Sequence, residues 1–384
     1  MIKKLNGLVI TYCYPPYNSP ESFITFKFLD ALSKEINLTL VKPEIEKKNI
    51  NFKFSQNIKI KEINVRIPPL INFLLNLKRL PLRPDRFLLY YPMFKNTLSK
   101  INIPKFDFVM TRSQFHSAHL LGLFLKKKYN IQWLASFSDP WYDNPVQKKV
   151  PFFDNVSFFL QKKVFEKTDL NMFPLEELMT HFNNQIKKDI KKNSLIVPHS
   201  IKKIKFGDNK RSNTIRFFGK IYAGRKIKNA LIALTNIIEL YKNIDVEFFV
   251  DNDFFISQKP LIEEFKKIKF IRYLNYEDYL KKLNQSLVLL LIDLDEDYGK
   301  LFFQSKMVDY IQSLRPILHI GKSETYNKKL VLESNGMSCL NNPINIFRTL
   351  EKLIQSEKKY KPNNKLLSLF NSNNIAQKVI KKIK

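Results

Sequence analysis

The residues best suited to chemistry lie in the run from Phe218 to Arg225, which holds two of the eight glycines in the chain. A strand-like run, Thr214 to Phe218, precedes it and an amphipathic helical pattern follows. In a chain so poor in glycine, this residue type indicates a sharp turn or a close backbone approach to a ligand. A turn that leads into a helix N-terminus offers free N–H groups, and two side chains add cations. We therefore predict a phosphate site at Gly219, Lys220 and Arg225, with an ordinary basic surface turn as the alternative.

Two further candidates follow apolar runs in the N-terminal half. His116 opens a helical pattern, where it could hydrogen-bond a hydroxyl, act as a base, or simply cap or pack. Asp139 precedes Pro140 and in the simplest interpretation forms a turn. We expect packing roles for His119 and His199.

Short apolar runs alternate with longer helical patterns along most of the chain. The strand candidates are Leu5 to Tyr12, Leu38 to Val41, Phe106 to Thr111, Gln132 to Phe137, Leu170 to Phe173, Thr214 to Phe218, Val246 to Val250, Phe270 to Tyr273, Leu287 to Ile292 and Ile317 to Ile320. The helix candidates are Glu21 to Ser33, Ser117 to Lys128, Phe152 to Lys167, Lys228 to Tyr241, Tyr276 to Asn284 and Ser305 to Leu314. Such alternation predicts parallel sheets covered by helices, and two series predict two doubly wound α/β domains joined by the polar stretch Lys202 to Asn213.

Composition limits the partners. The chain has 384 residues, 44% of them hydrophobic, and a formal net charge of +30. This charge favours nucleic acid or an anionic membrane, and we find no nucleic-acid-binding motif. Apolar clusters interleaved with Lys78, Arg79, Arg83 and Arg86 make Arg66 to Lys95 a candidate interfacial membrane segment, and a half-buried helical hairpin is the alternative.

Compartment follows from what the sequence lacks. Two distant cysteines, Cys13 and Cys339, suggest neither a disulfide framework nor a metal site. We find no signal peptide and no apolar run of about 20 residues. We therefore expect a cytoplasmic protein, held peripherally at the inner face of the cell membrane.

The order of these motifs resembles the retaining GT-B glycosyltransferases of family 4, in particular their bacterial surface-polysaccharide branch. Tyr14-Pro15-Pro16 looks like the loop of that family that faces the acceptor. The run from Ser113 to Ser117, followed by Asp139-Pro140-Trp141, is similar to a serine-proline-proline-histidine run that precedes an aspartate-proline-tryptophan signature. Here Gln114-Phe115 replaces the two prolines, and Ser138 replaces the usual arginine. The resemblance implies that Asp139 orients the acceptor hydroxyl and that His116 belongs to the catalytic set.

In the C-terminal half the same resemblance implies a donor site. Gly219-Lys220 and Arg225 match the glycine-basic pair and later cation that stabilise the departing nucleoside diphosphate. Asp309 falls in the second of two acid positions, where it would bond the ribose. Ser305 and Lys306 complete the expected donor-binding set.

The first acid position holds Leu301, which departs from the family pattern. Asp295, Glu296 or Asp297 are possible substitutes from the preceding loop.

No metal or cofactor is expected, because Lys220, Arg225 and Lys306 could neutralise the leaving group. Asp251-Asn252-Asp253 is the alternative, since it matches the acid-x-acid pattern of metal-dependent glycosyltransferases of another fold.

The resemblance implies a GT-B protein whose two Rossmann-like domains face a cleft. We expect residues 1–203 to bind the acceptor, residues 204–365 to bind a UDP- or GDP-sugar, and residues 366–384 to cross back to the first domain. The implied reaction is metal-independent, retaining transfer of a hexosyl or N-acetylhexosaminyl group to a lipid-linked surface glycan, as in lipopolysaccharide or capsule synthesis. A nucleotide-sugar epimerase and a GT-B binding protein without transferase activity are the alternatives.

Overall fold

The chain folds into two compact units, each described here by itself. The computed structural model describes residues 4–17, 19–44, 60–76, 82–145, 147, 149–201, 211–221, 225–294, 296–322, 324–356 and 363–383. The first unit is Met1–Ser200 with Ser372–Lys384, and the second is Ile201–Asn371. Most of the expected linker, residues 202–210, lies outside the described residues.

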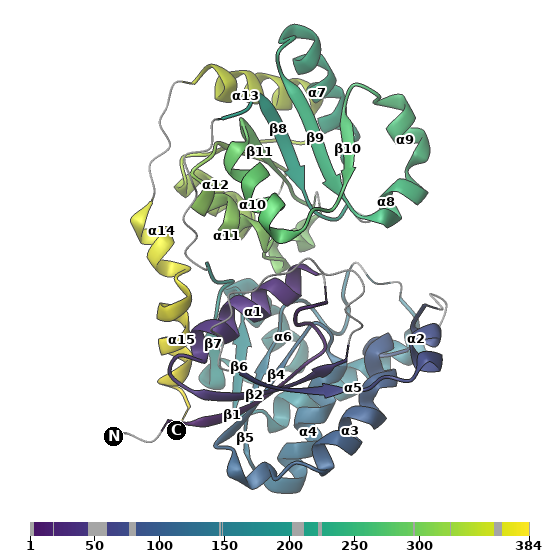
Figure 1. Ribbon diagram of the computed structural model, residues 1–384, viewed down its shortest axis with the longest axis vertical. Helices are drawn as coiled ribbons and strands as arrows, with labels where there is room; N and C mark the ends of the chain where they lie inside the picture. Colours follow the sequence, from purple (N-terminus) through teal and green to yellow (C-terminus); the bar gives the residue numbers. More distant parts are fainter. Residues whose placement is uncertain are drawn as a thin grey trace. The chain divides into compact units, whose positions relative to one another are not determined.

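The first unit is built on a parallel sheet in the order β3-β2-β1-β4-β5-β6-β7 (Figure 1). Its strands are β1 (Asn6–Thr11), β2 (Asn37–Pro43), β3 (Ile60–Val65), β4 (Phe108–Arg112), β5 (Gln132–Ser136), β6 (Leu170–Phe173) and β7 (Ser194–Ile196). Its helices are α1 (Pro20–Leu32), α2 (Pro69–Asn76), η1 (Arg86–Tyr90), α3 (Tyr91–Ser99), η2 (Ile103–Lys105), α4 (Ser117–Tyr129), α5 (Pro151–Lys167), α6 (Glu176–Ile186), η3 (Lys191–Asn193) and α15 (Ser372–Ile380).

The core of the first unit joins its two chain segments. Strand residues such as Val9, Leu40 and Met110 pack with Leu29 of α1 and Val379 of α15, all of them buried. Helix α15 thus packs in the same core as β1, so segments from far apart in the sequence form one unit.

The second unit is also built on a parallel sheet, in the order β10-β9-β8-β11-β12-β13 (Figure 1). Its strands are β8 (Thr214–Phe218), β9 (Asp245–Val250), β10 (Lys269–Arg272), β11 (Val288–Ile292), β12 (Ile317–Ile320) and β13 (Met337–Cys339). Its helices are α7 (Lys228–Leu240), α8 (Asn252–Ser257), α9 (Lys259–Glu264), α10 (Tyr276–Gln285), η4 (Asp297–Leu301), α11 (Lys306–Ser313), α12 (Tyr326–Glu333), α13 (Pro343–Gln355) and α14 (Asn364–Leu369). Helices α7 and α13 share the core with the strands.

Local sequence signals explain several helix starts. Ser19 caps α1 by accepting a hydrogen bond from the Ser22 amide, and Pro20 occupies the first turn. Asn342 caps α13 in the same way, again followed by proline. Such caps satisfy amides that have no partner within the helix.

The strand order fixes where a ligand would bind. In each sheet the order reverses beside the first strand of the unit, between β1 and β4 and between β8 and β11. In open parallel sheets, ligands bind outside the carboxyl ends of the strands at such reversals. The loops after β1, β4, β8 and β11 are therefore the places to examine.

A glycine in α4 provides a test of core packing. A Cβ atom at Gly122 would lie 2.3 Å from Cε2 and Nε1 of the buried Trp133 ring. We expect Gly122→Ala to destabilise the protein by about 1–3 kcal/mol, because overpacking outweighs the better helix propensity of alanine. Thermal unfolding measures the change, with the exposed Lys127→Ala on the same helix as control. Equal midpoints for the two variants would contradict the packing at Gly122.

Candidate functional site

The glycine loop after β8 lies against a half-buried lysine, Lys306. Gly219 has a φ of +136°, a conformation that side chains rarely adopt, and a Cβ there would lie 3.1 Å from Nζ of Lys306. Lys306 Nζ donates to the Phe218 carbonyl at 2.7 Å and lies 4.0 Å from the centre of the Phe217 ring. The structure thus brings together Gly219 and Lys306, two residues of the predicted donor set.

Arg225 and Lys220 belong to the same cluster. Arg225 is buried, and its Nη1 donates to the Lys220 carbonyl at 2.6 Å. Burial lowers the pKa of Lys306 well below its usual value, and the positive charge of Arg225 lowers it further. The intervening residues 222–224 lie outside the described part of the chain. Arg225 and Lys306 are both held against backbone carbonyls, and an anion beside them would favour the protonated form of Lys306.

The Lys220 ammonium points to the acid-x-acid sequence. Lys220 Nζ lies 3.1 Å from Asp251 Oδ2 and 3.9 Å from Asp253 Oδ2. Asp251 also caps α8 through the Phe254 amide. Across the described residues, no three His, Cys, Asp or Glu side chains are grouped as metal ligands would be.

Helix α11 carries the remaining predicted donor residues. Ser305 precedes its first turn, and the buried Asp309 accepts a hydrogen bond from Tyr279 at 3.4 Å. The Tyr310 hydroxyl accepts a hydrogen bond from the Phe218 amide at 3.3 Å and donates one to the Leu290 carbonyl at 3.4 Å. These bonds hold α11 at the carboxyl ends of β8 and β11.

Asp293, which the sequence analysis missed, organises the loops around α11. Its buried carboxylate accepts from Thr325 at 2.8 Å, from Asn327 at 3.3 Å and from Gln304 at 3.2 Å. His319 Nε2 lies 3.3 Å from it. These hydrogen bonds hold the pKa of Asp293 below its usual value despite burial. The Asp293 carboxylate, which follows β11, therefore connects Gln304, before α11, with Thr325 and Asn327 at the start of α12.

Leu301, in the first acid position of the family pattern, is buried in η4. Of its possible substitutes, Glu296 lies 3.8 Å from Lys226, Asp297 begins η4, and Asp295 is not among the described residues.

In the first unit, His116 is held by stacking on Trp141. The two rings are 5.0 Å apart and inclined by 8°. His116 Nε2 lies 3.3 Å from the Pro140 carbonyl, an arrangement that requires the proton on Nε2, and the buried Nδ1 has no hydrogen-bond partner among the described residues. Burial lowers the pKa of His116 to about 4. At neutral pH this side chain is a neutral acceptor through Nδ1.

Asp139 takes part in a hydrogen bond donated by Gln114, whose position replaces a proline of the family pattern. Burial raises the pKa of Asp139. Trp141 is core, as its exposed fraction of 2% shows, and His119 packs with Nδ1 2.8 Å from Thr111 Oγ1. His199 is buried as well.

Glu21, in the first turn of α1, was not predicted as a site residue. Its carboxyl accepts from Ser138 at 2.9 Å and lies 3.7 Å from Arg112. Burial raises the pKa of Glu21 to about 8 even though Arg112 opposes this. The side chain that replaces the family's arginine, Ser138, thus contacts a buried carboxyl group at the carboxyl ends of β4 and β5.

Asp85 fixes the entry to α4 near His116. Its carboxylate accepts from the Ser117 amide at 2.9 Å and hydroxyl at 2.7 Å, and from the Phe87 amide at 3.0 Å. One side chain therefore caps both η1 and α4.

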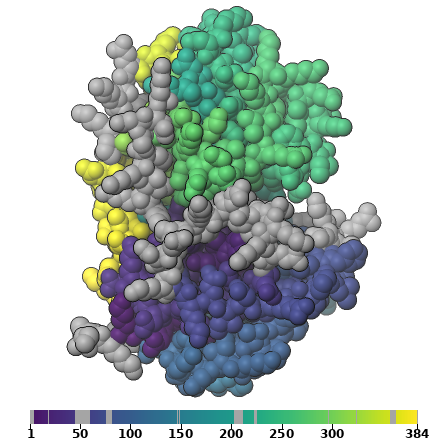
Figure 2. Space-filling view, viewed as in Figure 1, coloured from purple at the N-terminus to yellow at the C-terminus, as the bar shows by residue number. Residues whose placement is uncertain are grey.

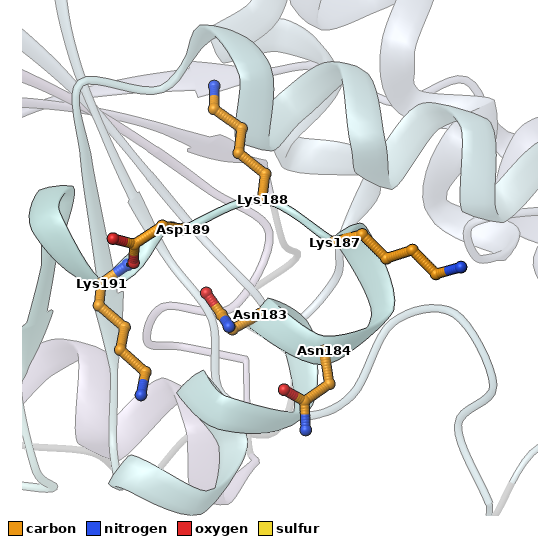
Figure 3. Close-up of a pocket in the computed structure, with 6 residues that line it drawn as sticks. All are labelled: Asn183, Asn184, Lys187, Lys188, Asp189 and Lys191. Carbon is orange, nitrogen blue, oxygen red and sulfur yellow. The ribbon is translucent and has the colours of Figure 1, made fainter.

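A separate hollow of about 700 Å³ lies at the end of α6, lined by Asn183, Asn184, Lys187, Lys188, Asp189 and Lys191. Figure 3 shows its three lysine side chains pointing in different directions instead of converging. Lysines at a helix C-terminus interact favourably with its dipole, which accounts for them without a ligand.

Two parallel α/β units of seven and six strands, with polar groups gathered at the points where the strand order reverses, define a protein of the GT-B fold. HepE of Anabaena, solved with UDP and glucose, is similar over 99% of both chains, with a TM-score of 0.70 and 8% identity. A glycosyltransferase from Rickettsia africae has a TM-score of 0.64 and 13% identity, over 100% of this chain and 98% of its own. UDP-GlcNAc 2-epimerase from Neisseria meningitidis, bound to UDP-GlcNAc, has a TM-score of 0.57 and 10% identity over 99% of both chains. No family model and no curated protein matches the sequence.

The cation cluster predicts a specific loss of affinity. Arg225→Ala should weaken binding of a nucleoside diphosphate by about 1.5–3 kcal/mol, the range for a hydrogen bond to a charged group. The neighbouring Lys226, which faces Glu296, provides the matched control Lys226→Ala. Calorimetry measures both affinities. Equal affinities for the Arg225 and Lys226 variants would remove the cluster from the site.

The lowered pKa of Lys306 leads us to expect that a proton is taken up when a nucleoside diphosphate binds. Burial and Arg225 hold the pKa of Lys306 low in the free protein, and a bound anion raises that pKa. Lys306 therefore takes up a proton when the anion binds. The affinity for the anion falls as pH rises from the pKa of the free protein to the pKa of the complex. Titrations of nucleoside diphosphate in buffers of different ionisation enthalpy measure this uptake. We expect Lys306→Met to lose the buffer dependence, and a wild-type protein without uptake would contradict a site at Lys306.

Proposed function

We propose that this protein transfers a glycosyl group from a UDP- or GDP-sugar to a lipid-linked glycan of the bacterial surface, with retention of configuration and without a metal. The observation that carries the proposal is the pair Arg225 and Lys306 at the carboxyl end of β8. There Arg225 is held by the Lys220 carbonyl, and the Lys220 ammonium pairs with Asp251. Similar folds in HepE and in the Rickettsia africae protein support the transferase class.

The chemistry of the donor site follows from charge. When the bond between the sugar and the diphosphate breaks, negative charge develops on the leaving oxygen, and preformed cations stabilise that charge most effectively where water is excluded. Arg225 is buried and Lys306 is half-buried, and Gly219 lets the backbone approach closely. In this proposal Asp309 binds the ribose and Ser305 lies beside the diphosphate.

The acceptor side rests on the first unit. In this proposal Asp139, with its raised pKa, orients the acceptor hydroxyl, and the neutral His116, whose Nδ1 is itself buried, supports the site beside it. His116 is uncharged at neutral pH, which suits an uncharged sugar hydroxyl.

Two other functions have specific support. Several proteins of similar fold are UDP-GlcNAc 2-epimerases, which favours an epimerase. Leu301, buried where the resembled family has an acid, favours a binding protein without transferase activity.

A turnover assay separates these functions. With a panel of UDP- and GDP-sugars we expect release of nucleoside diphosphate, unchanged by a chelator and reduced at least about tenfold in Arg225→Ala, since about 1.4 kcal/mol corresponds to a factor of ten. Lys226→Ala should release it at the wild-type rate.

Each alternative gives a different result in the same assay. Conversion of the donor sugar without nucleotide release would identify an epimerase, and binding with neither reaction would identify a binding protein. Loss of activity with chelator, restored by manganese or magnesium, would instead indicate a metal at Asp251 and Asp253.

A further inference from the structure

The outer face of α5 is apolar, although a surface helix is ordinarily polar there. Phe152, Val156 and Phe159 are 73%, 39% and 55% exposed. Their spacing of four and three residues places them on one face, opposite the buried Val164 and Phe165. These three side chains form a stripe that the first unit itself leaves uncovered.

Helix α2 adds a second apolar surface to the same part of the unit, with Leu70 and Phe73 exposed by 66% and 61%. The segment after α2 connects the two helices. Arg86 donates to the Leu75 carbonyl of α2 at 2.9 Å, and Arg83 Nε lies 2.8 Å from Asp154 in the first turn of α5. Both helices are therefore anchored to residues 83–86. In Figure 2 the blue surface at the right edge has the colour of α2 and the residues that follow it.

Cations flank the apolar stripe. The last two turns of α5 carry Lys162, Lys163 and Lys167 against one acid, Glu166. Lys163 Nζ lies 5.1 Å from the centre of the Phe159 ring, so its charge sits at the edge of the apolar face. Long lysine side chains can extend from such a face to lipid phosphates while the aromatic rings enter the acyl boundary.

We propose that α5 and α2 dock the first unit on an anionic membrane surface, with Phe152, Val156, Phe159, Leu70 and Phe73 inserted and the α5 lysines on the lipid headgroups. The charge complementarity of these lysines, within a chain of net charge +30, selects anionic lipid over a second copy of the chain. Among the described residues, no helix combines the length and the apolar character needed to cross a bilayer. The evidence for this membrane face comes from α5 and α2. Its biological role rests on the proposed function, because a lipid-linked acceptor lies at the membrane.

This surface differs from the membrane segment predicted from sequence. Arg83 is only 12% exposed and pairs with Asp154, so its role is internal. Lys78 and Arg79 lie outside the described residues. The predicted segment contributes α2, and the helical-hairpin alternative describes the part at α2, η1 and α3.

The test is sedimentation of the full chain with vesicles, without nucleotide. We expect binding to vesicles of equal parts phosphatidylglycerol and phosphatidylcholine, weak binding to phosphatidylcholine alone, and loss of binding between about 0.1 M and about 1 M salt. Phe152→Ser with Phe159→Ser should weaken binding at least about tenfold. Changing Lys162, Lys163 and Lys167 to Gln should weaken it about fivefold per lysine at low salt.

Two matched controls locate the effect. Ile256→Ser removes an apolar residue that is 80% exposed in the second unit, and Gln at Lys187, Lys188 and Lys191 removes the basic cluster of Figure 3. Both should bind vesicles like the wild type.

Equal losses in the controls and in the α5 variants would overturn the docking face. So would α5 variants that bind vesicles normally but change the sedimentation from dimer to monomer. Nucleoside diphosphate affinity, measured on the same variants, should be unchanged. Failed vesicle binding with normal nucleotide binding would remove the membrane face and leave the donor site standing.

Discussion

The proposed donor site depends on holding Lys306 and Arg225 together at the end of β8. Burying like charges side by side costs stability unless an opposite charge or oriented oxygens compensate. The protein supplies the Phe218 carbonyl to Lys306 and the Lys220 carbonyl to Arg225. Asp293 supports this arrangement from behind, since its hydrogen bonds fix the residues that lead into α11. The Asp293 carboxylate also acts on Arg225 and Lys306 as an opposite charge, so the cluster has a carboxylate partner in addition to the two carbonyls.

The first unit shows the opposite electrostatic arrangement. Glu21, Asp85 and Asp139 are carboxyl groups whose pKa values burial raises, and His116 is kept neutral by the same cause. Glu21 and His116 are uncharged at neutral pH and can take part in hydrogen bonds to hydroxyls, whereas the proposed donor site in the second unit carries cations. The two chemistries fit an uncharged acceptor and a charged donor, and neither unit by itself has both.

Much of the fold could be predicted from the sequence. All ten predicted strands exist within a few residues of their expected ends, because all of them except the half-exposed edge strand β10 are mostly buried runs in a parallel sheet. The edge strands β3, β7 and β13 were missed, since their half-exposed residues give a weak apolar run, whereas the fourth edge strand, β10, was predicted from Phe270 to Tyr273. Several helices were missed as well, among them α6 and α13.

The site was predicted less completely. Gly219, Lys220 and Arg225 could be proposed because glycine and basic residues adjoin in the chain. The structure places Gly219 beside Lys306 and Arg225 on the Lys220 carbonyl, and their binding role stays a prediction. Glu21 and Asp293 could not, because the groups that bury them come from distant segments.

The path of the chain has a consequence for how the protein is made. Residues 201–371 are inserted between two parts of the first unit, and the two connections run side by side, since the Ile201 amide donates to the Phe370 carbonyl at 2.7 Å. Val379 and Ile375 of α15 belong to the core of the first unit, yet the ribosome makes them after the whole second unit. Until α15 is translated, the first unit therefore lacks part of its core and exposes the apolar residues that α15 covers. The second unit is continuous in sequence and can fold before the first is complete.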